Sequence, residues 1–127
     1  MRKHHVRISL PWPSFYLSPN CRSHWSVRWK YGRAFRGQAR ILTLEALKGK
    51  RVCPIGRSKV EVQMFFFPPR RGKYDEDNLI ARMKTGIDGI ASAIRVDDSR
   101  FHYRESFIKT PGKPGHVEVH LYWKEEH

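Results

Sequence analysis

The first part of this 127-residue chain lacks acidic residues, because no Asp or Glu precedes Glu45. The whole sequence contains 25 Lys and Arg but only 12 Asp and Glu, which gives a formal net charge of +13 at pH 7. A protein with this charge attracts polyanions, and it could bind nucleic acid, an acidic lipid surface or an acidic protein. The high aromatic content, with four Trp, five Tyr and seven Phe, favours nucleic acid among these three.

Long apolar runs and cysteines are also scarce. No apolar run approaches the roughly 18 residues that cross a bilayer, so we expect no membrane-spanning segment. The basic start of the chain has no apolar stretch after it, because Pro11 and Pro13 interrupt the short run, and we expect no cleaved signal peptide. The two cysteines, Cys21 and Cys53, predict no disulfide framework and favour the reducing cytoplasm.

The residues that are present favour one folded domain over residues 1–127. Hydrophobic residues make up 39% of the chain, which argues against a disordered basic tail. Alternating apolar residues predict strands over 6–10 and 59–67, whereas 14–34 has no period and is expected to be a long loop. Two more strands, 100–109 and 116–123, are joined by a Pro- and Gly-rich turn that predicts a hairpin.

Apolar spacings of three and four residues predict two main helices, from about Phe35 to Gly49 and from about Asn78 to Ile94. The resulting order, β-α-β-α-β-β, predicts an α/β (α+β) domain with a small mixed sheet. The second helix has one side of small residues, Gly86, Gly89 and Ala93, which permits the close approach of another element. The sequence leaves open whether that element belongs to a partner subunit.

Half of the acidic residues gather in one short part of the chain. They are Asp75, Glu76, Asp77, Asp88, Asp97 and Asp98. Carboxylates inside a cationic field repel phosphate, unless divalent metal ions lie between the two. The cluster therefore indicates metal-assisted chemistry on a nucleic-acid backbone.

The spacing of these acids allows several of them to face one way. Asp75 and Asp77 point to the same side if the backbone there is extended, and they could share a metal ion. Asp77 also suits a helix N-cap, which is the structural alternative. At about 100° per residue, Lys84 and Asp88 lie about 20° to either side of the direction of Asp77. The alternative for Lys84 and Asp88 is a surface salt bridge, worth a few tenths of a kcal/mol.

The adjacent Asp97 and Asp98 could supply a third carboxylate, although an Asp-Asp-Ser sequence by itself indicates a turn. Mg²⁺ prefers oxygen ligands and keeps several of its waters. One or two such ions at a phosphodiester would activate water and stabilise the attacking and leaving oxygens. Lys84 would then be a fixed positive charge at the transition state, or it would orient the attacking water.

Cations and aromatic residues alternate between residues 22 and 40. The cations are Arg22, Arg28, Lys30, Arg33, Arg36 and Arg40, and the aromatic residues are Trp25, Trp29, Tyr31 and Phe35. Such a segment can bind phosphates and stack on unpaired bases. Alternatively the aromatic residues belong to the core, which we favour for Phe35 and leave open for Trp25 and Trp29. Near the carboxylates, Arg70, Arg71 and Lys73 could clamp a nucleic-acid backbone.

Several of these motifs together resemble the RusA-type Holliday-junction resolvases of phages and prophages. The matching motifs are Arg70-Arg71, Asp75-Glu-Asp-Asn78, Lys84-Thr-Gly-Ile-Asp-Gly89 and Asp97-Asp98. Near the N-terminus, Leu10-Pro-Trp-Pro13 and Ser18-Pro-Asn-Cys-Arg22 resemble the opening strand and loop of that family. The resemblance covers nearly the whole chain.

This resemblance implies a homodimeric, Mg²⁺-dependent endonuclease that cuts four-way DNA junctions in recombination and repair, in a bacterial cell or a phage-infected host. It also implies a small α/β fold. The residues that it implies are the metal ligands Asp75, Asp77 and Asp98 (or Asp97), the catalytic Lys84, and the supporting Asn78 and Asp88. The lysine lies about one helical turn later than in the family pattern, so Arg82 stays a competitor. The alternatives are a non-catalytic nucleic-acid-binding protein, or a nuclease that acts on flaps or RNA.

Overall fold

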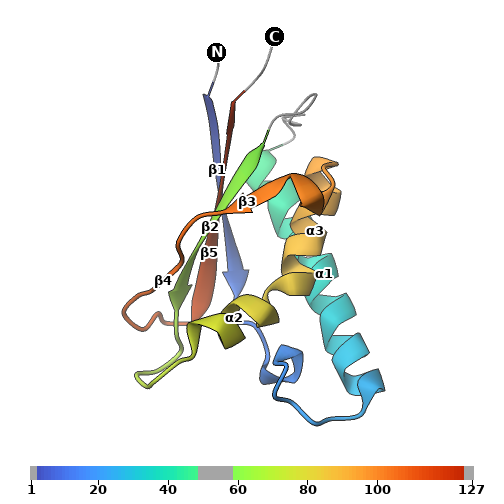
Figure 1. The fold of residues 1–127 in the computed structure, drawn as a ribbon, viewed down its shortest axis with the longest axis vertical. Helices are drawn as coiled ribbons and strands as arrows, with labels where there is room; N and C mark the ends of the chain where they lie inside the picture. The colour runs from blue at the N-terminus through green and yellow to red at the C-terminus, as the bar shows by residue number, and fades with distance from the viewer. Residues whose placement is uncertain (1–2, 49–58, 125–127) are drawn as a thin grey trace.

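The computed structural model of the protein describes residues 3–48 and 59–124. The elements in chain order are β1 (Lys3–Pro11), η1 (Phe15–Leu17), α1 (Trp25–Leu47), β2 (Val60–Phe67), α2 (Glu76–Arg82), α3 (Lys84–Ile94), η2 (Asp98–Arg100), β3 (Phe101–Tyr103), β4 (Phe107–Ile108) and β5 (His116–Lys124). They form a small mixed α/β domain, as predicted (Figure 1).

The strands form one mixed sheet in the order β1-β5-β2-β3, and β4 also pairs with β2. Strand β5 is antiparallel to both β1 and β2, so that Leu121 lies opposite Val6 on one side and Val62 on the other. Strands β3 and β4 are parallel to β2. The predicted hairpin between 100–109 and 116–123 is therefore wrong.

The buried residues of β5 explain its central position between β1 and β2. Its Val117, Val119 and Leu121 are fully buried, which a central strand with a partner on each side allows. The turn before β5 passes the end of β2, where the amide of Gly112 donates to the carbonyl of Pro68 at 2.9 Å. The chain thereby moves from one side of β2 to the other.

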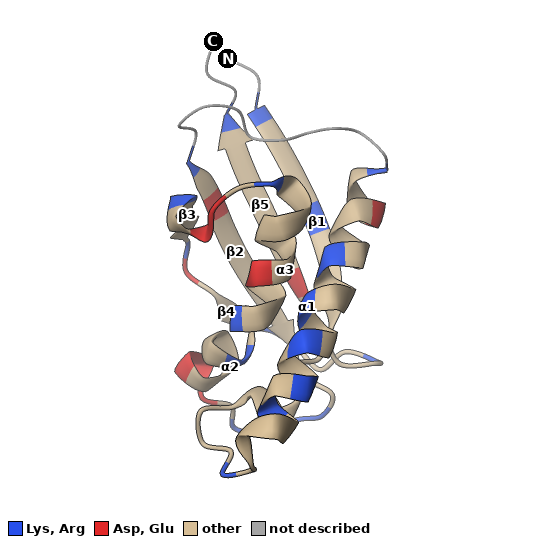
Figure 2. Ribbon diagram, turned by 90° about the vertical axis from the view of Figure 1, so that its right-hand side faces the viewer, with Lys and Arg blue, Asp and Glu red and all other residues tan. Residues whose placement is uncertain are grey.

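The described helices all lie on one face of the sheet, and α1 and α3 run side by side there (Figures 1 and 2). The core forms between this face and the helices, with Val62 and Phe66 of β2 and Ile87 and Ile90 of α3 among its members. The opposite face of the sheet has no helix among the described residues. No described helix is long and apolar enough to span a membrane. Cys21 is buried and free, and Cys53 lies outside the described residues.

Helix α1 begins at Trp25, ten residues before the predicted start at Phe35, so the prediction of a loop over 14–34 is wrong for its second half. The side chain of His24 caps the helix by accepting the amide of Ser26 at 3.2 Å. The buried stripe begins at Gly32, a residue that carries no apolar side chain. The helical period was therefore hidden at its N-terminal end. The predicted end at Gly49 lies just outside the described residues.

The predicted helix from Asn78 to Ile94 is two helices, α2 and α3, which are separated by Met83. The small side of α3 packs against α1 of the same chain. A Cβ added at Gly86 would lie 2.6 Å from Cε2 of Phe35, and one added at Gly89 would lie 2.2 Å from the carbonyl oxygen of Arg36. The element that approaches closely is therefore α1, which leaves this side of α3 covered.

Candidate functional site

Three acidic residues stand at the start of α2, and all three are exposed. Asp75 is the N-cap, with φ −80° and ψ 115°, and its Oδ1 accepts the amide of Asn78 at 3.2 Å. Glu76 and Asp77 lie in the first helical turn. The prediction that Asp77 is the cap is wrong, because Asp75 is the last residue with extended backbone before the helix. Asp75 and Asp77 are thus not alternate residues of an extended segment.

The residues that follow join α2 to the segment after β1. The side-chain amide of Asn78 donates to Oγ of Ser18 at 2.8 Å, and its Oδ1 accepts Nε of Arg82 at 3.0 Å. Arg82 also donates to the carbonyl of Pro13 at 3.5 Å, and its guanidinium lies 5.5 Å from the ring centre of Phe15. Burial lowers the pKa of Arg82. Arg82 is therefore occupied by contacts that hold the fold together.

Lys84 begins α3, one residue after the break at Met83, and its side chain is exposed. Among the described residues it forms no ion pair, so the surface salt bridge to Asp88 is not found. Asp88 itself is half-buried on the same helix. The structure thus gives the two competing cations different surroundings, and Lys84 is the more accessible to a substrate.

The charges of Asp88 and Asp98 both influence the pKa of one side chain, the phenol of Tyr103 at the end of β3. Partial burial raises the pKa of Tyr103, although the residue is 55% exposed, and the negative charges of Asp98 and Asp88 raise it further. Asp98 is the exposed first residue of η2, so carboxylates from two different elements influence the same region. The sequence pattern did not reveal Tyr103, because the parallel pairing of β3 with β2, which places Tyr103 opposite Val62, is not encoded in local residue spacing.

The neighbouring Asp97 has a different environment. It caps η2, and its Oδ1 accepts the amide of Ser99 at 2.9 Å. This hydrogen bond lowers the pKa of Asp97. The turn interpretation of the Asp-Asp-Ser sequence is therefore correct for Asp97, while Asp98 is the member of the pair whose charge raises the pKa of Tyr103.

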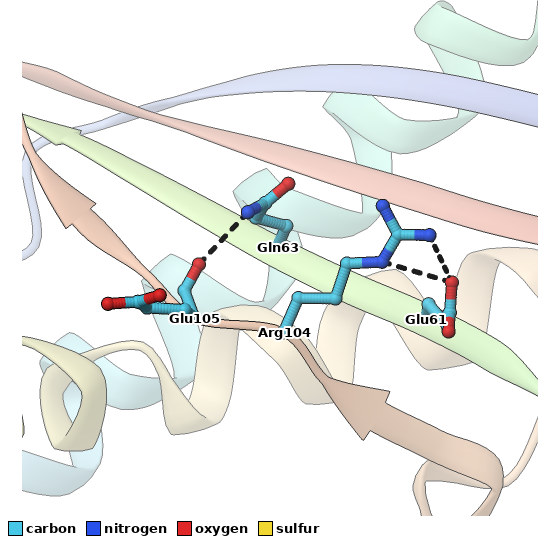
Figure 3. Close-up of polar contacts among 4 residues, drawn as sticks. All are labelled: Glu61, Gln63, Arg104 and Glu105. Atoms are coloured by element: carbon cyan, nitrogen blue, oxygen red, sulfur yellow. Dashed lines mark hydrogen bonds and ion pairs between the residues drawn. The ribbon is translucent and has the colours of Figure 1, made fainter.

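The segment between β3 and β4 is held against both α2 and β2. Ser106 is buried, and its hydroxyl donates to Oε1 of Glu76. Arg104 donates through two nitrogens to Glu61 on β2, and Gln63 donates to the carbonyl of Glu105 at 3.0 Å (Figure 3). Glu76 is thus a structural contact rather than a free carboxylate.

Acids and cations occupy neighbouring parts of the helical layer. Figure 2 shows Asp and Glu on α2, on α3 and beside β3, and a series of Lys and Arg along α1. The cations of α1 that the sequence singled out are all exposed, namely Arg28, Lys30, Arg33, Arg36 and Arg40. Arg22, Arg70, Arg71 and Lys73 are exposed in the loops that precede α1 and α2.

The aromatic residues of α1 differ in burial, which decides between the core and the surface interpretation for each of them. Phe35 is buried, which confirms that it belongs to the core. Trp25 and Trp29 are 71% and 59% exposed, so the core reading is wrong for both. The guanidinium of Arg33 lies 5.3 Å from the ring centre of Trp29. Both tryptophans are therefore available to a partner.

The donors at this site are oxygens, which suit Mg²⁺. Within the described residues, no three or more His, Cys, Asp and Glu side chains are grouped so that they could hold a metal ion. Mg²⁺ is commonly bound through one or two carboxylates with waters filling the other positions, so the exposed Asp98 and the half-buried Asp88 are each suitable ligands by their chemistry. The sharing of one ion by Asp75, Asp77 and Asp98 stays a prediction.

Comparison with known proteins adds one relative. No protein-family model matches the chain. A protein of Xylella fastidiosa strain Temecula1, described as uncharacterized, is 40% identical over 94 residues, which cover 74% of this chain. The chain spans 61% of the length of that relative.

Proposed function

We propose that this protein is a Mg²⁺-dependent endonuclease that cuts four-way DNA junctions, as its resemblance to the RusA family implies. The observation that carries the proposal is the distribution of charge in Figure 2, with acidic residues on α2, on α3 and beside β3, and Lys and Arg along α1. It supports a local concentration of carboxylates within a protein whose net charge is +13. Carboxylates in a DNA-binding protein repel the phosphates of the DNA, unless a divalent cation lies between the carboxylates and a phosphate.

The residues divide into three roles. Asp75, Asp77 and Asp98 hold the ion, and Asp88, which the resemblance gives only a supporting part, is a further candidate ligand. When bound, Mg²⁺ would activate a water molecule and stabilise charge on the attacking and leaving oxygens. Lys84 supplies a fixed positive charge to the phosphate. The exposed cations of α1 and of the turn before α2 bind the flanking backbone.

The decisive experiment incubates the full chain with a labelled four-way junction and with a matched duplex, in Mg²⁺ or in EDTA. We expect the junction to be cut in Mg²⁺ alone. Asp75→Asn, Asp77→Asn and Asp98→Asn should abolish cleavage while junction binding in EDTA survives. Glu45→Gln, an exposed acid near the end of α1, is the control and should cut as the wild type does.

A pair of substitutions separates the two adjacent aspartates. Asp98→Asn should lose cleavage at unchanged stability, whereas Asp97→Asn keeps a side-chain oxygen that can cap η2 and should retain both cleavage and stability. Loss of cleavage in Asp97→Asn at unchanged stability would transfer the ligand role to Asp97.

The second candidate function is a non-catalytic nucleic-acid-binding protein. The observation in its favour is that Asp75 and Asp97 both cap helical segments, which gives them structural roles. Junction binding without cleavage in Mg²⁺ would support this candidate over the nuclease. Flap and RNA substrates in the same assay test the remaining nuclease alternatives.

We also propose that the active form is a homodimer in the cytoplasm of a bacterial cell or a phage-infected host. A symmetric junction needs two matched incisions, which two identical subunits supply. Sedimentation of the free protein and of its junction complex measures the number of subunits directly. A monomer in both states would contradict the dimer.

A further inference from the structure

Gly37 lies in the middle of α1, and the packing of the protein gives no reason for a glycine there. A Cβ added at Gly37 would meet nothing within 4 Å. The other helical glycines of the described residues differ, because a Cβ at Gly32, Gly86 or Gly89 would lie close to the opposing helix. Glycine inside a helix is destabilising relative to alanine. The packing of the fold therefore does not require a glycine at position 37.

The missing side chain leaves a hollow on the exposed face of α1. Trp29, Arg33, Gly37 and Ile41 line it, and its volume is about 720 Å³. All of its lining residues belong to α1, so the hollow is open to solvent, and a planar ring could lie on it against Trp29. Trp29 and Ile41 are 59% and 56% exposed, so an apolar surface faces the solvent here.

The charge around the hollow selects its occupant. Lys30 and Arg33 border it, and Arg28, Arg36 and Arg40 are exposed on the same helix. The only acidic residue of α1 is Glu45, near the far end. A second copy that docked through α1 would place these cations against their own equivalents, which is unfavourable. An anionic partner is attracted instead.

An indole with a guanidinium over it suits a nucleobase. Unpaired bases stack on aromatic rings and on the planes of arginine side chains, and basic groups hold the phosphates on either side. The guanidinium of Arg33 lies 5.3 Å from the ring centre of Trp29, at the border of the hollow.

We propose that the hollow over Gly37 binds one unpaired nucleobase, stacked against Trp29, while Lys30 and Arg33 bind the adjacent phosphates. This deepens the DNA-binding part of the proposed function and does not depend on cleavage. It makes the substrate class DNA with unpaired bases, such as those that a branch point exposes. A small residue at position 37 then matters, because a side chain much larger than a methyl group would occupy the place of the base.

The test measures binding of the full chain in EDTA to two duplexes of equal length. One carries a single unpaired 2-aminopurine and the other is fully paired. The wild type should bind the first more tightly and should quench its fluorescence. Gly37→Leu fills the hollow with a good helix former and should lose at least about tenfold affinity for the first duplex, with the paired duplex unaffected. Trp29→Ala should behave in the same way.

Two control variants make the result specific. Gly37→Ala adds only a methyl group and should retain most of the preference, and Leu44→Ala removes an exposed apolar side chain of α1 that does not line the hollow. Equal losses in Leu44→Ala and Trp29→Ala, or an undiminished preference in Gly37→Leu, would overturn the proposal. Binding of neither duplex, together with a dimer that Gly37→Leu dissociates, would assign the hollow to a second copy instead.

Failure of the nuclease proposal gives a different result. Wild-type protein that prefers the unpaired base in EDTA but cuts no junction in Mg²⁺ supports the nucleobase site and contradicts the nuclease. Junction cleavage by the wild type that Gly37→Leu leaves unchanged, without any preference for the unpaired base, supports the nuclease and contradicts the nucleobase site.

Discussion

The side-chain amide of Asn78 donates a hydrogen bond of 2.8 Å to the hydroxyl of Ser18, joining positions that are 60 residues apart in the chain. Ser18 is fully buried, and its Oγ also accepts the amide of Asn20 at 3.1 Å. The loop after β1 therefore positions the first turn of α2, where Asp75 and Asp77 stand.

Ser18→Ala should lower the free energy of unfolding by about 1–3 kcal/mol, because it leaves the amide of Asn78 without this acceptor. Urea denaturation measures the change. Ser9→Ala, an exposed serine of β1, is the matched control and should stay within about 0.5 kcal/mol of the wild type. Equal effects of the two substitutions would show that the hydrogen bond contributes nothing.

Two glycine-to-alanine substitutions in helices should act in opposite directions. Gly37→Ala should raise the free energy of unfolding by about 0.5–1 kcal/mol, because its Cβ meets open space and alanine favours the helix. Gly89→Ala should lower it by about 1–3 kcal/mol, because the Cβ would lie 2.2 Å from the backbone oxygen of Arg36. Thermal unfolding of the two variants compares them. A stabilised Gly89→Ala would refute the close packing of α1 on α3.

Substitutions of Lys84 and Arg82 should have different effects, the first on the rate of cleavage and the second on the stability of the fold. Lys84→Gln should reduce cleavage by about 10²-fold or more at unchanged stability, because it removes the exposed charge that the proposed function assigns to the phosphate. Arg82→Gln should lower the free energy of unfolding by about 1–3 kcal/mol, because its contacts to Asn78 and Pro13 are lost. Cleavage rates and urea midpoints of both variants make the comparison. The reverse pattern would make Arg82 the catalytic cation.

The open face of the sheet should make stability depend on pH through His5. Its Nε2 lies 2.8 Å from Nδ1 of His120, and burial, with the charges of His120, Arg7 and Arg104, lowers the pKa of His5. The unfolded chain therefore binds a proton at His5 first as the pH falls below about 6.5, and the free energy of unfolding decreases there.

His5→Phe should weaken this decrease, because phenylalanine keeps a ring beside Tyr122 but cannot take up a proton. Urea midpoints at pH 7.5 and pH 5 measure the difference. His102→Gln removes an exposed histidine of β3 and should leave the pH dependence of the wild type intact. An unchanged pH dependence in His5→Phe would exclude this pair as its source.

The elements that the sequence predicted correctly are those with a strong local period. The strands that contain Val6 and Val62 follow alternation, and the isoleucines of α3 follow the helical period. The start of α1 was missed because glycine and cations occupy its first turns. The break at Met83 was missed because a buried methionine continues the apolar period through the bend. The place of β5 between β1 and β2 was missed because local turn residues do not record long-range pairing.

The sequence predicted which types of residue the candidate site contains, but not how their side chains are arranged in space. The sequence by itself determined the charge of this protein, the cluster of carboxylates and the periods that form its strands and helices, because these depend on residues close together in the chain. Tertiary structure alone decided that Arg82 and Asn78 hold the N-terminal loop, that Asp98 and Asp88 act on Tyr103, and that Gly37 stays exposed while Gly86 and Gly89 are covered. The reason is physical: hydrogen bonds, charge interactions and close packing depend on distances between side chains, and folding sets those distances between segments that are remote in sequence.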